Sequence, residues 1–182
     1  MELTNNLKIF FPGKLVFANG CINQLAEEVQ SLGAKKVFIA TIAPLQNVID
    51  TLVSQLKEKG IETQIDTSIV QEPGFSDFEK LMQKVHPFNP DAVIGIGGGS
   101  VLDVAKLVAA QLENNQQLRD YVGIGLLNGR KKKLICVPAT SGTGSEASPN
   151  AILVDNADNQ KKGIISPYLV PDIVYVDPLL TV

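Results

Sequence analysis

Ala92-Val93-Ile94-Gly95-Ile96-Gly97-Gly98-Gly99-Ser100 is the stretch of this 182-residue chain that decides its fold. An apolar run passes directly into a glycine run, and a helical apolar pattern follows from Val101 to Leu112. Consecutive glycines let a backbone turn sharply or approach a ligand closely. Between a strand and a helix, their amides and the positive end of the helix dipole would face an anion. The stretch therefore predicts a strand, a phosphate-binding loop and a helix, with a tight packing turn as the alternative to the loop.

The glycine run departs from the two common phosphate-loop signatures. Gly-x-Gly-x-x-Gly beginning at Gly95 would need a glycine where Ser100 stands, and no Gly-Lys-Ser/Thr follows. Ser100 and Asp103 have the spacing of a capping box, with Asp in place of the usual Glu, which predicts that the helix begins at Ser100. Lys106, in the second turn, could approach a phosphate, lie at the surface or form a structural ion pair.

The apolar segments on either side repeat the alternation of strand and helix. Val37–Ala40 is an unbroken apolar run, typical of a parallel strand that is covered on both faces. Further strands are expected at residues 61–65, 134–137, 152–154 and 173–176, and further helices at 22–32, between Pro44 and Gly60, and after Gly74. The order predicts an α/β fold, a Rossmann-like parallel sheet with helices on both faces.

The first apolar segments surround a turn signal. Residues 8–11 and 15–17 flank Pro12-Gly13, and this order reads as strand, turn and strand. We therefore expect an N-terminal β-hairpin in addition to the parallel sheet.

Composition narrows the class of protein. Hydrophobic residues make up 45% of the chain and charged residues 19%, which is typical of one soluble globular domain, and no run is long enough to span a bilayer. The net charge of -3 argues against nucleic acid or anionic membranes as partners, and we expect the basic run 130–133 to be a solvated loop. Cys21 and Cys136 form no disulfide or metal-binding pattern, and Cys136 lies in an apolar run where burial is expected. Without a visible signal peptide, a cytoplasmic location is expected.

A second loop carries polar groups at the expected carboxyl end of another strand. Residues 138–146 follow the strand at 134–137 and supply several hydroxyls and flexible amides. Loops at the carboxyl ends of parallel strands line one ligand crevice, so this loop should converge on the glycine run. An exposed Ser/Gly loop is the alternative. The lone His86, at a helix end, cannot form a histidine-rich metal site by itself.

These residues together resemble a known family. Residues 97–106 match the Gly-Gly-Gly-Ser-x-x-Asp-x-x-Lys signature of iron-containing (group III) alcohol dehydrogenases, and residues 140–146 are similar to their Thr-x-Gly-Thr-x-x-Glu loop. Pro167, Pro171 and the segment 177–181 also follow in the family's order, so the resemblance covers nearly the whole chain.

The resemblance implies a domain that lacks part of the chemistry. Family members have an N-terminal α/β domain for NAD or NADP and a C-terminal helical domain whose divalent metal, iron or zinc, polarises the alcohol oxygen during hydride transfer. Their metal ligands, an Asp and three His, lie beyond the region matched here. Residues 1–182 therefore resemble the dinucleotide-binding domain alone, catalytically incomplete and a possible homodimer through an N-terminal edge strand. A freestanding nucleotide-binding, regulatory or oligomerisation module without catalysis is the alternative.

The resemblance also implies a cofactor site. Its residues are Gly97, Gly98, Gly99, Ser100, Asp103, Thr140, Ser141, Thr143, Ser148, Ile152, Lys161 and Leu180. Residues 97–100 would hold the pyrophosphate, Lys161 would reach the nicotinamide ribose and Leu180 would lie near the adenine.

One further position bears on the choice of cofactor. Family members that prefer NAD commonly carry Thr-Asp where this chain has Thr41-Ile42, and the acid repels a 2′-phosphate. Ile42 removes that repulsion without supplying a cation, so the sequence permits NADP as well as NAD and leans toward NADP.

Overall fold

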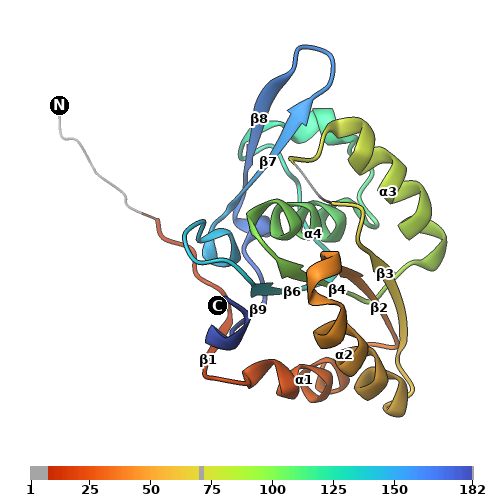
Figure 1. Ribbon diagram of the computed structural model, residues 1–182. Coiled ribbons are helices and arrows are strands. Elements are labelled where there is room, and N and C mark those ends of the chain that lie inside the picture. Colours follow the sequence, from red (N-terminus) through yellow and green to blue (C-terminus); the bar gives the residue numbers. More distant parts are fainter. Residues whose placement is uncertain (1–7, 70–71, 182) are drawn as a thin grey trace.

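A six-stranded parallel sheet forms the centre of the computed structural model, which describes residues 8–69 and 72–181 (Figure 1). The strand order is β1-β9-β6-β4-β2-β3. The strands are β1 (Lys14–Phe17), β2 (Lys36–Ala40), β3 (Glu62–Asp66), β4 (Ala92–Gly97), β6 (Lys133–Pro138) and β9 (Ile173–Val176), and the helices are α1 (Leu25–Ser31), α2 (Gln46–Glu58), α3 (Phe75–Phe88) and α4 (Gly99–Gln111). The predicted Rossmann-like α/β fold is confirmed.

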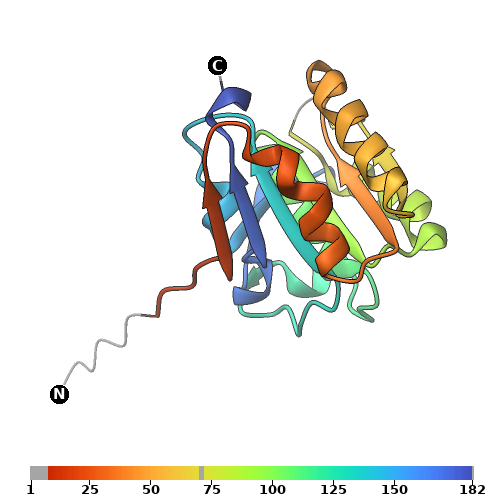
Figure 2. The same ribbon diagram turned by 90° about the horizontal axis from the view of Figure 1, so that it is seen from below.

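Two apolar layers lie on opposite faces of this sheet. Along β2, Phe38 packs in the cluster that contains α3 and α4, whereas Val37 and Ile39 pack in the cluster that contains α1 and α2. Successive side chains of a strand point to opposite faces, so an unbroken apolar strand can supply both layers. Figure 2 shows α1 and α2 together on one side of the sheet. The centre of the sheet, where β4 lies, is therefore shielded from water on both faces.

A second, three-stranded sheet was not foreseen in the sequence. It has the order β5-β8-β7 and consists of β5 (Gly123–Ile124), β7 (Asn150–Asp155) and β8 (Gln160–Ile165). Strands β7 and β8 form an antiparallel hairpin, in which Val154 lies opposite Lys161. In Figure 1 this hairpin rises above the main sheet. It brings Ile152 and Lys161 onto one small sheet.

The predicted N-terminal β-hairpin is wrong. Residues 8–12 carry no strand, and β1 pairs with β9 in parallel, with Lys14 opposite Ile173. Residues 8–11 are exposed, with Phe11 retaining 75% of its accessible surface, so their apolar side chains have no core to join. A strand at this place would need a partner that the described chain does not provide. Strand β1 is instead the edge of the sheet.

Two local predictions also need correction. Helix α4 begins at Gly99 with Gly98 at its N-cap, and no side chain caps it, so the capping box of Ser100 and Asp103 is not formed. The basic run is not a solvated loop throughout, because Lys132 is buried and pairs with Glu113. Cys136 is fully buried, as expected.

The helices give no sign of a membrane span. Among residues 8–69 and 72–181, none combines the length and apolar character needed to cross a bilayer.

Candidate functional site

The glycine loop and the threonine loop leave the same edge of the sheet side by side. Their strands, β4 and β6, are neighbours in the sheet, with Gly97 opposite Pro138. Beyond the last pair, the amide of Ala139 donates to the carbonyl of Gly97 at 2.9 Å. In Figure 1 the loop after β6 lies beside the start of α4. The predicted convergence of the two loops is confirmed.

The glycines of the first loop differ in what they allow. A Cβ on Gly95 would lie 2.7 Å from the Cβ of Ala105, so this glycine lets α4 pack directly on β4. A Cβ on Gly99 would lie 3.0 Å from the Cγ2 of Thr143, so this one lets the threonine loop approach the first turn of α4. The packing turn, one of the two alternatives in the sequence, is therefore present at Gly95, and Gly99 lies where the two loops meet.

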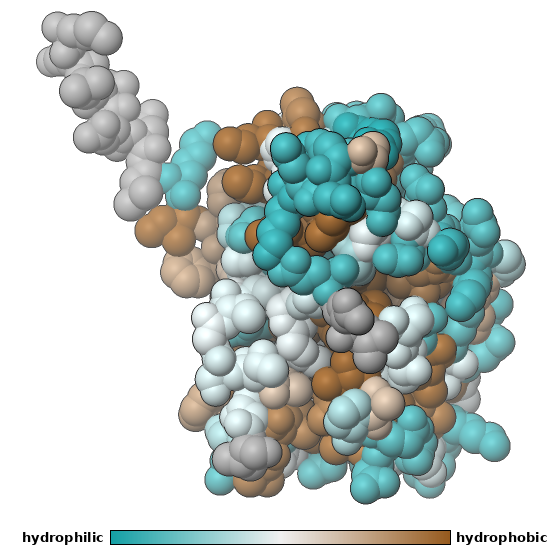
Figure 3. All heavy atoms as spheres, turned by 45° about the horizontal axis from the view of Figure 1, so that its top comes forward, coloured by the Kyte–Doolittle hydropathy of each residue, from teal (hydrophilic) through white to brown (hydrophobic). Residues whose placement is uncertain are grey.

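The threonine loop presents its hydroxyl groups to solvent. Thr140, Ser141 and Thr143 are exposed, and Gly142 and Gly144 have φ of 132° and 64°, in the left-handed region that favours glycine. Figure 3 shows a patch of pale spheres, of near-neutral hydropathy, beneath the hydrophilic lobe on the left of the view. Hydroxyls and free amides gathered beside a helix N-terminus suit an anionic ligand.

A cleft of 220 Å³ lies between this edge and the β7–β8 hairpin. The predicted residues that line it are Gly99, Ser100, Asp103, Thr143, Ser148, Ile152 and Lys161. Lys161 forms an ion pair across the cleft with Glu72, and both side chains are more than half exposed. Elements far apart in sequence, α4 and the hairpin, therefore contribute to one site.

The other predicted residues lie outside the lining of this cleft. Gly97, Gly98, Thr140 and Ser141 belong to the same two loops, whereas Thr41, Ile42 and Leu180 come from elsewhere. Ile42 precedes a 3-10 turn after β2 and is packed partly against the α3–α4 core. Leu180 packs against the opposite core. Since β2 and β9 are parallel to β4, both residues follow the same edge of the sheet.

Thr41 is buried at this edge. Its amide donates to the carbonyl of Asp66 at 2.9 Å, while its Oγ1 has no hydrogen-bond partner within the described chain. The hydroxyl is thus enclosed beside Ile42, which itself remains half-buried.

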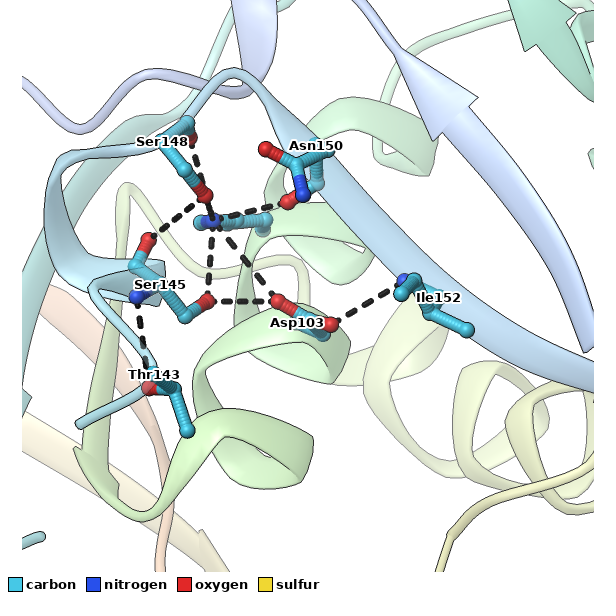
Figure 4. Close-up of polar contacts among 7 residues, drawn as sticks. Asp103, Thr143, Ser145, Ser148, Asn150 and Ile152 are labelled. Atoms are coloured by element: carbon cyan, nitrogen blue, oxygen red, sulfur yellow. Dashed lines mark hydrogen bonds and ion pairs between the residues drawn. The ribbon is translucent and has the colours of Figure 1, made fainter.

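Lys106 is enclosed by the end of the threonine loop and the residues that follow it, up to Asn150. Its side chain has no accessible surface, and its Nζ donates to the carbonyl of Asn150 at 2.9 Å, to Ser145 Oγ at 3.0 Å and to the carbonyl of Ser148 at 3.1 Å (Figure 4). Asp103 lies 3.7 Å away. Of the roles that the sequence left open, the structure supports the structural ion pair.

The buried charge has electrostatic consequences for its surroundings. Desolvation lowers the pKa of Lys106, and the negative charge of Asp103 opposes that decrease. Burial raises the pKa of the Cys136 thiol to about 12, although the nearby ammonium of Lys106 favours the thiolate. Cys136 is therefore a protonated core residue rather than a nucleophile.

The chain is similar in sequence to known proteins. A sequence profile described as iron-containing alcohol dehydrogenase matches residues 12–178. The chain belongs to this family. It is 36% identical over 180 residues to long-chain-alcohol dehydrogenase 1 of Geobacillus thermodenitrificans, covering 96% of this chain and 45% of that protein. It is 35% identical over 170 residues to sulfoacetaldehyde reductase of Bilophila wadsworthia, covering 92% and 44%.

Solved structures of iron-containing alcohol dehydrogenases share the fold. The chain superposes on a 1,3-propanediol oxidoreductase with a TM-score of 0.90 and 26% identity, covering 97% of this chain and 47% of that one. For the NADH-dependent butanol dehydrogenase A of Thermotoga maritima the TM-score is 0.86 and the identity 28%, covering 96% and 45%. The chain thus spans less than half the length of these relatives.

The described residues contain no site for the iron ion after which the family is named. Within 8–69 and 72–181, no three His, Cys, Asp or Glu side chains gather where they could hold a metal ion. His86 lies at the end of α3, beside a groove with Glu79 and Arg119. The residues described here therefore do not fit a metal centre.

Six residues that line the cleft were not predicted as site residues: Glu72, Pro73, Ser145, Asn150, Leu153 and Val154. Ser145 lies within residues 140–146, which resemble the family's Thr-x-Gly-Thr-x-x-Glu loop, so its place in that motif could have indicated that it lies at the site. Glu72 precedes Pro73, whose carbonyl accepts from the amide of Val154 on β7 at 3.0 Å, and the carboxylate of Glu72 pairs with Lys161 on β8.

Proposed function

We propose that residues 1–182 form the dinucleotide-binding domain of a two-domain, metal-dependent alcohol dehydrogenase. The observation that carries this proposal is the convergence of the glycine and threonine loops at the N-terminus of α4, above a cleft. Family membership supplies the reaction class, the interconversion of an alcohol and an aldehyde or ketone by hydride transfer. The substrate itself is left open, since the relatives act on different compounds.

The pyrophosphate of the cofactor would rest on the glycine loop. The amides of Gly98–Ser100 and the positive end of the α4 dipole favour negative charge at this place. The absence of a Cβ on Gly99 keeps the space beside Thr143 open. Exposed hydroxyls of Thr140, Ser141 and Thr143 would donate to phosphate or ribose oxygens.

The nicotinamide end would lie along the β7–β8 hairpin. Lys161 and Ile152 line the cleft there, and Lys161 would donate to a ribose hydroxyl if its ion pair with Glu72 opened. The bound nicotinamide supplies the hydride acceptor or donor. The hairpin and the threonine loop would line that end of the cofactor and would keep water from one side of it.

Residues 1–182 alone should bind the cofactor but should convert little or no alcohol or aldehyde. Among the described residues there is no group that could hold the polarising metal, so a C-terminal helical domain or subunit would have to provide it. We also propose a cytoplasmic homodimer, because β1 is an open sheet edge with exposed Leu15 and Phe17 and because both cysteines are free.

Titration of the purified chain with NADH and NADPH, followed by nicotinamide fluorescence, tests the proposal. A saturable change with at least one cofactor is expected from protein whose circular dichroism shows it to be folded. Folded protein without a saturable signal for either cofactor would overturn the proposal.

Ile42 provides a test of cofactor preference within the same assay. If the 2′-phosphate of NADPH lies beside Ile42, Ile42→Asp should weaken NADPH binding roughly tenfold or more, since a like charge at close range costs more than about 1.4 kcal/mol. NADH binding should change little. Ile42→Asn is the matched control, with the same shape and no charge. An unchanged NADPH-to-NADH ratio in Ile42→Asp would show that Ile42 does not face the 2′ position.

A freestanding nucleotide-binding module is the second candidate. It rests on the same two loops, which support nucleotide binding without requiring a catalytic step. The coding sequence downstream of residue 182 separates the two, because the dehydrogenase requires a helical region with Asp and His ligands there.

A further inference from the structure

We propose that Lys106 and Asp103 are positioning residues, which clamp the segment 143–152 onto α4 and so set the width of the cofactor cleft. The effect on cofactor binding rests on the proposed function above, whereas the clamp itself does not. Both residues belong to the glycine-loop signature, yet their polar atoms are directed at the chain rather than at a ligand.

The ammonium of Lys106 has no capacity left for a phosphate. An ammonium group has three hydrogens to donate. Three acceptors of the segment, the carbonyls of Ser148 and Asn150 and the hydroxyl of Ser145, lie between 2.9 and 3.1 Å from its Nζ, and Ser148 Oγ lies at 3.2 Å. No part of the lysine side chain is accessible to solvent. Lys106 therefore binds the segment and cannot reach the cleft.

Asp103 holds the same segment at two points, one of which it shares with Lys106. Its Oδ1 accepts from Ser145 Oγ at 2.5 Å, and its Oδ2 accepts from the amide of Ile152 at 3.0 Å (Figure 4). Ser145 thus bridges the two charged groups, accepting from the lysine and donating to the carboxylate. Together the two side chains contact the segment from its first turn, at Ser145, to β7, at Ile152.

The clamp reaches the cleft through Thr143. The Oγ1 of Thr143 accepts from the amide of Ser145 at 3.3 Å, and its Cγ2 lies where a Cβ on Gly99 would be only 3.0 Å away. The position of Ser145 therefore decides how far Thr143 stands from the first turn of α4. If Ser145 is released, this gap widens, and Thr143 moves away from a diphosphate that rests on the glycine loop and the threonine loop together.

Charged groups suit this task better than apolar ones. An apolar residue at position 106 would leave the partly buried carbonyls of Ser148 and Asn150 without the lysine donor, which is unfavourable. The fixed geometry of four acceptors around one nitrogen selects a single position of the segment, whereas apolar packing would tolerate several. Removing only Lys106 or only Asp103 should reduce the stability of the domain by more than the energy of their contact, because the remaining charge is left without its partner.

The test compares three variants with a control of similar stability. Lys106→Met removes the donors, Asp103→Asn removes the carboxylate charge, and Ser145→Ala is the mildest change, deleting only the bridging hydroxyl. Val29→Ala is the control, because Val29 is fully buried on α1 in the opposite core and does not touch the segment. The first readout is the hydrogen-exchange rate of the Ile152 amide relative to amides of β4, and it needs no ligand. The second is the dissociation constant for NADH and NADPH.

The clamp predicts faster exchange at Ile152 in all three variants, with β4 unchanged, and a roughly tenfold weaker binding of whichever cofactor the wild type binds. Val29→Ala should melt at a lower temperature but keep the wild-type affinity. If Val29→Ala weakens binding as much as Ser145→Ala, the network contributes only stability and the positioning role is refuted. Unchanged exchange at Ile152 in Ser145→Ala and Asp103→Asn would refute the clamp. Faster exchange combined with no cofactor binding by the wild type would support the clamp and refute the proposed function, so the two failures are distinguishable.

Discussion

Substitution of Gly95 by alanine should destabilise the domain although it adds a single methyl group. A Cβ at this position would lie 2.7 Å from the Cβ of Ala105 and 3.2 Å from the Cδ2 of Leu102. Carbon atoms in contact prefer a separation of about 3.5–4.0 Å, so strand and helix would have to part by about 1 Å. Overpacking of this kind costs about 1–3 kcal/mol, while alanine recovers about 0.5–1 kcal/mol of chain entropy. The expected net loss is therefore about 0.5–2 kcal/mol in the free energy of unfolding.

Urea unfolding followed by circular dichroism measures this loss, and a second substitution tests its cause. Ala105→Gly removes the atom that the new Cβ would meet, at a cost of about 1 kcal/mol in helix propensity. The double variant Gly95→Ala/Ala105→Gly should then lose about 1 kcal/mol less than the two single losses added together. Gly129→Ala is the control, since nothing lies within 4 Å of its Cβ position, and its change should stay within about 0.5 kcal/mol. Strictly additive losses would refute the close approach of β4 and α4.

Two further predictions concern the glycine loop and the ion pair of Arg119 with Asp155. Gly99→Ala places a Cβ 3.0 Å from the side chain of Thr143 and should weaken NADH or NADPH binding roughly tenfold in the fluorescence titration. Gly129→Ala is the control and should bind the cofactor as the wild type does. A wild-type affinity in Gly99→Ala would mean that the cofactor does not contact the first turn of α4. Hydrogen bonds from Arg119 lower the pKa of Asp155 to about 2. Because the folded pKa lies below the unfolded value, the stability gained from ionised Asp155 is present above about pH 4 and is lost as the pH falls toward 2. The melting-temperature difference between wild type and Asp155→Asn should shrink over that window, and a constant difference would contradict the assignment.

The main sheet was predictable because burial leaves a clear pattern in its strands. The apolar runs at β2, β4, β6 and β9 are covered on both faces, and each was found close to its observed bounds. Strand β8 was missed because only Ile164 of its six residues is buried, so Gln160–Ile165 has no alternation to recognise. The N-terminal hairpin was predicted wrongly for the opposite reason, since Ile9, Phe10 and Phe11 are apolar but exposed.

The candidate site was predictable in its loops but not in its internal contacts. The topology of a parallel sheet brings the loops after β4 and β6 together, and the sequence gives both strands. The side chains of Asp103 and Lys106 point toward the segment 143–152. The position of that segment depends on the β7–β8 hairpin, which was not foreseen. A signal for burial of Lys106 did exist, because Val101–Leu112 is apolar almost all round and leaves a lysine little access to water.

The parallel pairing of β1 with β9 has a consequence for synthesis of the chain. Lys14 lies opposite Ile173, so β9, the one neighbour of β1 among the described residues, leaves the ribosome only after residues 18–172 have been made. Until then β1, with its exposed Leu15 and Phe17, is a free strand edge that can pair with another nascent chain. Closure of so long a loop makes this pairing the last step expected in assembly of the sheet. A ribosome that stalls before residue 173 would therefore leave an apolar strand unpaired for a chaperone to cover.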